Sequence, residues 1–319
     1  MDQEDELATM AMQPIQRWQY RVTFDLRVRN AYGVAFQDFF SAILEARYGS
    51  DFIRVRPFGS LGDKGCDGYR GTGGQVFQCY GKLEDAAPKV ATIVKKIGDD
   101  YQLSGGHLGT IMKEWHFAHN LVSGLPIEAV QKIEELKQAG AHVVGVFGPA
   151  SLWTIVEALS ETELFNLLGP AATAEDSQNL KLEEVRLLTD SLMASISSGT
   201  VLNGSIKPVP SDKLAFNQLP GHWVQLLTLA STNGPYVQQY FEQNSDVELG
   251  ARIAQAFSSR YLALKQEALT PGQIMDALYE QTTGMGSVTT VRQVAAQALL
   301  AYLFDACEIF EDHADKVGA

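Results

Sequence analysis

Acidic and amide side chains that could bind a metal ion gather in residues 62–82. This segment reads Gly-Asp-Lys-Gly-Cys-Asp-Gly, then Tyr-Arg-Gly-Thr-Gly-Gly, then Gln-Val-Phe-Gln-Cys-Tyr-Gly-Lys. Its glycine-rich residues 71–74 predict a tight turn that folds the two flanking stretches into a hairpin. Asp63 or Asp67 would then come near Gln78. Carboxylate and amide oxygens at such a strand edge can hold a divalent cation and present a phosphate group to it.

The third strand of this region adds further polar groups on one face. Side chains alternate along a strand, so Gln78, Tyr80 and Lys82 are expected to point the same way. Gln78 fits a metal ligand and equally a buried amide that is satisfied within a central strand. Lys82 or Tyr80 would assist the attacking water in such a site, although for Tyr80 packing is a simpler role than chemistry.

The two aspartates of the segment also allow a structural interpretation. Asp67 falls inside a predicted strand, where a turn residue has no evident task, and this favours metal binding. Asp63 lies next to glycine in a loop, where aspartate is common for conformational reasons.

An amphipathic helix predicted over 34–47 precedes the hairpin and carries Gln37, Asp38 and Glu45. Each could lend a ligand to the same site, and each is equally explained as an exposed polar residue of a helix. His116 and His119, in a later strand, are expected to be structural.

Charge and composition limit the class of protein. The chain has 319 residues, 45% of them hydrophobic, and a net charge of −13. Residues 1–100 hold 13 basic and 14 acidic side chains, so almost all of the excess acidity follows residue 100. Arginines and lysines near the hairpin either form a local basic surface for phosphates or are ordinary solvated side chains.

The cysteines and the apolar segments indicate the compartment. Cys66, Cys79 and Cys307 are too few for a disulfide framework and lack metal-ligand spacing, which favours small buried side chains in a reducing, cytoplasmic environment. No run is long and apolar enough for a membrane span, and the start of the chain does not read as a leader.

The order of predicted elements gives the fold class. Residues 34–159 predict helix, three strands, then helix, strand, helix, strand, helix, which is an α/β domain with a mixed sheet and parallel pairing in its second part. Residues 20–29 alternate apolar and charged residues, as a half-exposed strand or an amphipathic arm would. Residues 104–109 read as a loop after a helix that ends near 103.

Beyond residue 160 the pattern becomes helical. We expect an N-terminal domain with its arm over 1–160, a helical linker over 161–213, and an all-α C-terminal domain over 214–319. The acidity of this last region fits contact with proteins better than contact with nucleic acid. Self-association through it, as a homo-oligomer, is compatible with the sequence.

The hairpin motif resembles the PD-(D/E)XK restriction-endonuclease fold. It is closest to the Mrr-like branch, in which a Gly-Asp-x-Gly-x-Asp loop leads to a strand with Gln-x-Lys. The resemblance implies that Asp67 and Gln78 bind Mg²⁺ or Mn²⁺, with Asp63 as the preceding loop aspartate. The chain departs from the pattern at Tyr80, where the family has lysine. Lys82 carries the nearest amine on that face, and turnover should fall if no amine assists.

A wider set of motifs is similar to bacterial proteins of ABC-three-component conflict systems. It includes Phe-Gln-Asp-Phe-Phe at 36–40, the segment from Arg56 to Gly68, Trp-His-Phe-Ala-His-Asn at 115–120 and the helix at 301–311. This resemblance implies a DNA-cleaving effector of anti-phage or anti-plasmid defence, regulated by an SMC-like or ABC-type ATPase and accompanied by a third small component of the same operon. The alternative is a catalytically degenerate domain that acts as a DNA sensor or assembly adaptor. A small-molecule or nucleotide-binding α/β domain would need a glycine-rich loop directly after a strand, and the chain has no good one.

Overall fold

The protein divides into two compact units. The computed structural model describes residues 14–57, 64–82, 89–195, 213–284, 288–306 and 309–311. A sheet unit comprises Phe24–Leu167, and a helical unit combines the stretch up to Thr23 with the chain from Leu168 onward. The domain limits expected at residues 160 and 213 stay predictions, since 196–212 lie outside the described residues.

The sheet unit follows the order expected for residues 34–159. Its elements are α2 (Val34–Tyr48), β1 (Phe52–Arg54), β2 (Gly68–Arg70), β3 (Gln75–Tyr80), α3 (Val90–Leu108), β4 (Glu114–His119), α4 (Ile127–Ala139), β5 (Val143–Phe147), α5 (Pro149–Glu157) and α6 (Glu161–Leu168), with a 3-10 turn at Gly49–Asp51. Among the described residues, five strands form one sheet in the order β1-β2-β3-β4-β5. The first three strands pair antiparallel and the last three parallel, which confirms the predicted mixed sheet.

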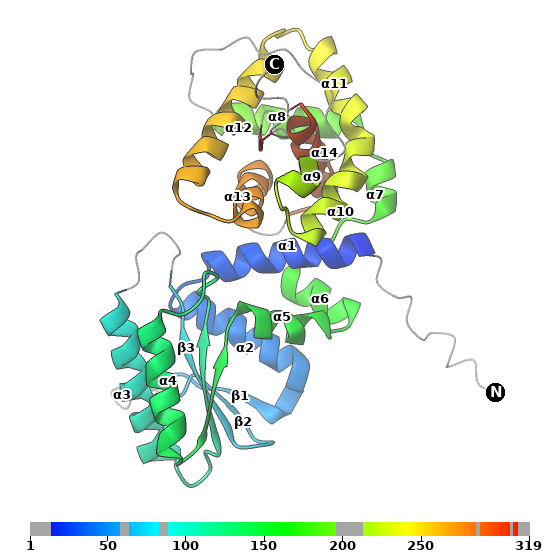
Figure 1. The fold of residues 1–319 in the computed structure, drawn as a ribbon. Helices are drawn as coiled ribbons and strands as arrows, with labels where there is room; N and C mark the ends of the chain where they lie inside the picture. Colours follow the sequence, from blue (N-terminus) through cyan, green and yellow to red (C-terminus); the bar gives the residue numbers. More distant parts are fainter. Residues whose placement is uncertain are drawn as a thin grey trace, which may run out of the picture. The chain divides into compact units, whose positions relative to one another are not determined.

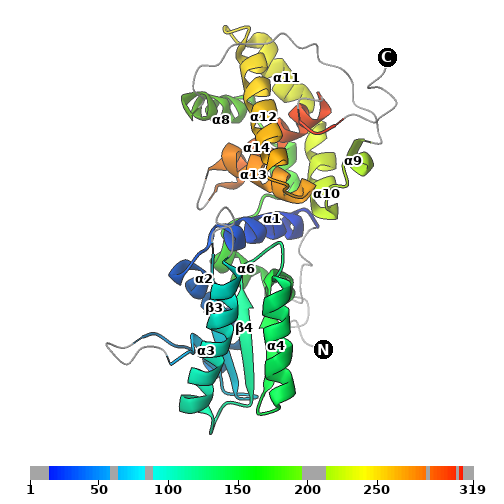
Figure 2. The same cartoon turned by 60° about the vertical axis from the view of Figure 1, so that its left-hand side comes forward.

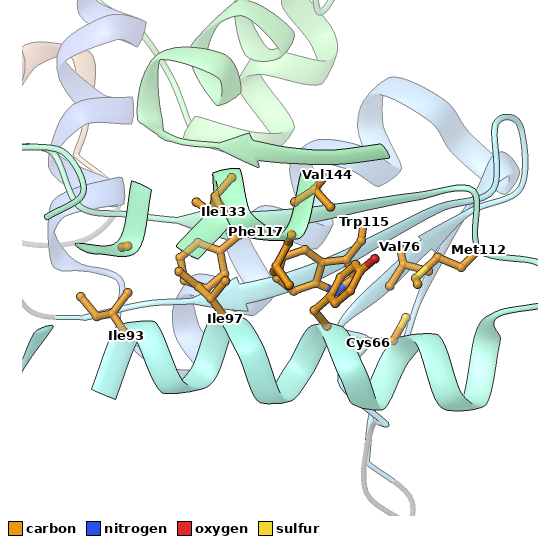
Figure 3. Close-up of a cluster of buried hydrophobic side chains, with 12 residues drawn as sticks. Cys66, Val76, Ile93, Ile97, Met112, Trp115, Phe117, Ile133 and Val144 are labelled. Carbon is orange, nitrogen blue, oxygen red and sulfur yellow. The ribbon is translucent and has the colours of Figure 1, made fainter. Parts of the chain in front are cut away.

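Helices cover both faces of this sheet. Figure 1 and Figure 2 show α3 and α4 side by side over one face, with α2 and α5 on the other. The α3 face buries a cluster from β3, β4 and the two helices, in which Val76, Ile97, Trp115, Phe117 and Ile133 are almost fully buried (Figure 3). On the α2 face, Phe77 packs against Phe40 with ring centroids 5.5 Å apart. Because successive side chains of β3 alternate between these two packed faces, its orientation is firmly set.

The alternating segment 20–29 is helical. It belongs to α1 (Pro14–Asn30), whose buried residues do not form a single stripe. Tyr20 and Val22 fall in the stretch grouped with the helical unit, whereas Phe24 and Val28 belong to the sheet unit. Because this one helix contributes buried residues to two cores, its apolar residues alternate along the sequence as they would in a strand.

The segment 104–109 also differs from the expected loop, because α3 continues to Leu108. Tertiary packing overrides the poor helix propensity of two consecutive glycines. The Ser104 hydroxyl is fully buried and donates to Gly65 O at 2.6 Å. A Cβ added at Gly105 would lie in ordinary van der Waals contact with Met112 and His142.

The helical unit confirms the expected all-α C-terminal part. Its elements after α6 are α7 (Ala174–Gln178), α8 (Leu182–Ser195), α9 (Lys213–Phe216), α10 (Gly221–Ala230), a 3-10 turn (Ser231–Asn233), α11 (Gly234–Gln243), α12 (Leu249–Gln266), α13 (Pro271–Thr283) and α14 (Thr290–Asp305). Helix α14 is buried over most of its length and packs against α8, α10, α11 and α13. Within the core, the Trp223 indole donates to Asp276 Oδ1 at 2.8 Å.

Candidate functional site

Asp67 directly precedes β2 and does not lie inside a strand as predicted. The ladder begins with the pair Gly68 and Phe77, and Asp67 N donates to Phe77 O at 2.8 Å. Gly68 must be small here, since a Cβ would lie 2.5 Å from the Phe52 ring.

The Asp67 carboxylate is turned toward α2 and is held from two sides. Gln37 Nε2 of α2 donates to Oδ1 at 2.6 Å, and the Cys79 backbone N–H donates to Oδ2 at 2.7 Å. Only 5% of Asp67 is exposed. Gln37 is itself fixed, because its Nε2 also donates to Val55 O and its Oε1 accepts from Arg56 Nη1. The structure therefore brings together Asp67 and one of the expected contributors of the first helix.

The side chain of Gln78 points to the other face of the sheet, the one that α3 covers. It alternates with Val76 and Tyr80, which pack in the cluster beneath α3. Its side chain is buried, and its Oε1 accepts no hydrogen bond among the described residues. A buried carbonyl oxygen without a donor costs roughly 1–3 kcal/mol, and such groups in native proteins usually have a reason. Whether Gln78 and Asp67 bind one metal ion stays a prediction.

Lys82 lies two residues beyond the end of β3, so its expected place on the face of Gln78 and Tyr80 stays a prediction. At Gly81 an added Cβ would lie 2.4 Å from Phe36 Cβ of α2. The Lys82 Nζ is buried and has no hydrogen-bond partner within the described part of the chain. Its backbone N–H donates to Asn120 Oδ1 at 2.9 Å.

A second lysine reaches the same region from α3. Lys96 pairs with Asp100 at 2.6 Å, and its charge lowers the pKa of both Tyr80 and Cys79 in part. The net shifts are nevertheless upward. Burial raises the pKa of the Tyr80 phenol, and burial followed by the charge of Asp67 raises the pKa of the Cys79 thiol well above its usual value. Both groups are therefore neutral at pH 7.

Other expected contributors lie elsewhere or are not described. Asp38 and Glu45 both bind Arg54 of β1, at 3.1 and 2.6 Å, and Asp38 also pairs with Arg56. They form a partly exposed ion-pair network rather than facing Asp67. Asp63 lies outside the described residues.

Two polar residues that the motif did not reveal position this site. Ser104 holds the loop before Asp67 through Gly65, and Asn120 holds the chain after β3 through Lys82. Both contacts join residues about 40 positions apart in the sequence. The one sequence signal was the polar Asn120 directly after the apolar strand at 115–119.

The described side chains supply few classical metal ligands. Among them, no group of three or more His, Cys, Asp or Glu could hold a metal ion. Likewise, the described helices include none that is long and apolar enough to cross a membrane.

Comparison with known proteins places the C-terminal part of the chain. Neither the curated proteins nor the solved structures include a match. Residues 183–311 match a family described as C-terminal domain 10 of the ABC-three component (ABC-3C) systems. The match covers helices α8 to α14 of the helical unit and does not extend to the sheet unit. This part of the helical unit is therefore similar to C-terminal domain 10 of the ABC-three component systems.

Proposed function

We propose that this chain is a DNA-cleaving effector of an ABC-three component defence system, with a divalent cation at the Asp67 end of β2 and β3. The sheet unit would be a PD-(D/E)XK-like nuclease domain held at rest until an ATPase partner engages. One observation carries the proposal. The buried Gln78 Oε1, one position along β3 from the Cys79 N–H that binds Asp67, has no donor among the described residues.

The sheet topology supports this proposal. A helix, an antiparallel three-strand meander, a helix and a parallel strand is the order that the resemblance to the PD-(D/E)XK fold implies, and α2 to β4 follow it. Fold alone does not give function, so the nuclease function has to be tested at the Asp67 and Gln78 side chains.

The oxygen donors fit a hard divalent cation. Asp67 contributes a carboxylate, which accepts hydrogen bonds from Gln37 and Cys79, and Gln78 contributes an Oε1 that accepts none among the described residues. Mg²⁺ takes such oxygens and retains several waters, so one or two protein ligands suffice. Asp67 and Gln78 would hold Mg²⁺ or Mn²⁺, which when bound would lower the pKa of a water and polarise the phosphate.

The two lysines would take the part of the amine missing at position 80. The charge of Lys96 acts on Tyr80, and Lys82 follows Tyr80 by two residues with a buried Nζ. Positive charge there would stabilise the charge that develops on a phosphate during hydrolysis. Tyr80 itself, with its raised pKa, cannot serve as a base near pH 7.

The divergence of Asp67 and Gln78 fits a resting state. Asp67 is bound on the α2 side, whereas Gln78 points to the α3 side. The match to a C-terminal domain of the ABC-three component systems supports regulation by an ATPase partner. The ATPase and a third component would dock on the helical unit.

Plasmid nicking tests the proposal. We expect the chain, co-purified with the ATPase of the neighbouring gene, to nick supercoiled plasmid in Mg²⁺ or Mn²⁺ and to stop on addition of EDTA. Asp67→Asn should abolish nicking, and Asp99→Asn, which alters an exposed carboxylate paired with Lys95, should not. A complex that binds neither cation and leaves the plasmid intact contradicts the proposal.

The second candidate is a catalytically degenerate domain that serves as DNA sensor or assembly adaptor. The hydrogen bond from the neutral Gln37 amide to Asp67 and the tyrosine in place of the family lysine favour it. Calorimetry separates the two functions. If the domain is an adaptor, titration with Mg²⁺ or Mn²⁺ should give no binding heat at the Asp67 site, and the heat should therefore be the same for Asp67→Asn. The protein should still bind the ATPase.

A further inference from the structure

Asn120 joins three segments of the sheet unit through one buried side chain. It follows β4 directly and is 2% exposed. Its Nδ2 donates to Val28 O at 3.2 Å, to Ala31 O, and to Lys82 O at 2.8 Å, and its Oδ1 accepts from Lys82 N at 2.9 Å. The amide therefore links the carbonyls of Val28, in the last turn of α1, and of Ala31, directly after α1, to the chain that follows β3.

The junction between α1 and α2 also holds the other half of the candidate site. Gly33 N donates to Gly81 O at 3.0 Å, and Gln37 N donates to Gly33 O at 3.2 Å. Gln37 is the residue whose side chain binds Asp67. Asp67 through Gln37, and Lys82 through Asn120, are thus fixed to the same short stretch of chain.

The first turns of α1 are anchored in the helical unit. Residues up to Thr23 group with that unit, and Gln19 is 1% exposed. Gln19 Nε2 donates to Tyr279 OH of α13 at 3.0 Å, and Gln19 Oε1 accepts from Gln297 Nε2 of α14. A single helix therefore begins in the core that matches the ABC-three component domain and ends at the Asn120 contacts.

We infer that α1 transmits the state of the helical unit to the candidate site through the Asn120 hydrogen bonds at the end of α1. A partner that binds the helical unit and shifts α13 or α14 would act on α1 through Gln19. Release of Val28 and Ala31 from Asn120 frees the chain at Lys82, and movement of the α1–α2 junction loosens Gln37 from Asp67. This inference rests on the proposed function only in identifying the site, since the coupling itself can be measured without cleavage.

The exchange rate of the Lys82 amide proton reports on the Asn120 hydrogen bonds, because Lys82 N–H donates to Asn120 Oδ1. We expect Gln19→Ala, which breaks the anchor in the helical unit, to raise the hydrogen-exchange rate of the Lys82 amide about tenfold, as the loss of one hydrogen bond would. In an Asn120→Ala background the rate should already be raised, and Gln19→Ala should add nothing.

Asn233→Ala is the matched control. Asn233 is also a buried asparagine, 4% exposed, and its Nδ2 donates to Ser177 O at 2.8 Å within the helical unit. This variant should leave both the Lys82 exchange rate and its response to Gln19→Ala unchanged.

Three results would overturn the inference: no effect of Gln19→Ala on Lys82, an equal effect in both backgrounds, or loss of the response in the Asn233→Ala control. If Asn120→Ala does not fold, Asn120→Asp replaces it, because aspartate keeps the acceptor for Lys82 N and loses the donors to Val28 O and Ala31 O. A protein that shows the coupling and never nicks plasmid contradicts the proposed function and leaves the coupling standing.

Discussion

Removal of the Asp67 carboxylate should destabilise the sheet unit strongly, whatever its role in chemistry. Asp67→Ala leaves the Gln37 Nε2 and Cys79 N donors without their acceptor in a site that is 5% exposed. Each unsatisfied buried donor costs roughly 1–3 kcal/mol, so we expect a loss of about 4 kcal/mol in the free energy of unfolding. Asp51→Ala is the control. That carboxylate also accepts one backbone and one side-chain donor, Thr72 N and Arg70 Nε, but it is exposed enough for water to replace it, and the loss should be clearly smaller.

A double-mutant cycle isolates the contact with Gln37. The loss for Asp67→Ala combined with Gln37→Ala should be smaller than the sum of the single losses by roughly 1.5–3 kcal/mol, the range for a hydrogen bond to a charged group. Urea unfolding followed through the exchange protection of β3 and β4 amides measures the sheet unit without averaging over both units. A stability for Asp67→Ala within 1 kcal/mol of the wild type, or a coupling near zero, would refute the described hydrogen bonding.

Three further outcomes follow from single side chains. Burial lowers the pKa of His119 to about 4 from an ordinary 6.5, so between these pH values the unfolded chain binds a proton that the folded chain does not, and stability falls as pH drops. At pH 5 the wild type should therefore have lost about 2 kcal/mol of its free energy of unfolding. His119→Asn, which keeps an acceptor for Leu121 N, should not show this loss. Urea midpoints at pH 7 and 5 check this, with the exposed His107→Asn expected to behave like the wild type. Tyr80→Phe keeps the stacking on Phe117 and should leave nicking unchanged, because the neutral phenol takes no proton; a large fall in the nicking rate would contradict this. Lys213→Met deprives Phe304 O and Ile309 O of their buried donor and should lower the free energy of unfolding of the helical unit by about 2 kcal/mol. Limited proteolysis near the C-terminus should be faster in this variant. Resistance equal to that of the wild type would show that the Lys213 ammonium is dispensable.

Much of the sheet unit could be predicted from local pattern, because each element carries its own period and punctuation. The helix at 127–139 begins beside Pro126 and ends at Gly140, which adopts the left-handed conformation expected of a helix stop. The turn at 71–74 closes with a hydrogen bond from Gly74 N to Gly71 O. Segment 20–29 failed the same test, since the alternation in α1 reflects two different cores and no local signal distinguishes that from a strand.

The candidate site was predictable in residue type and less so in geometry. Asp67 and Gln78 could be selected from the motif, but the place of Asp67 just before β2, where its N–H donates to Phe77 O, depends on pairing across the hairpin. Helical spacing could not decide among Gln37, Asp38 and Glu45. Packing decided it, because Arg54 on β1 takes both acids and leaves Gln37 for Asp67.

The uneven satisfaction of polar groups at the site would give the proposed regulation its physical basis. Asp67 has donors for both oxygens, whereas Gln78 Oε1 and Lys82 Nζ have no partner among the described residues. Two buried groups without a partner raise the free energy of the resting arrangement by roughly 2–6 kcal/mol. This amount is at least as large as the coupling free energy of roughly 1–3 kcal/mol that is typical between two binding sites. A ligand that satisfies Gln78 and Lys82 could therefore offset the loss of the Gln37 contact. A partner acting through α1 would need to supply only part of the difference, and the exchange rate of the Lys82 amide is where that contribution should first become measurable.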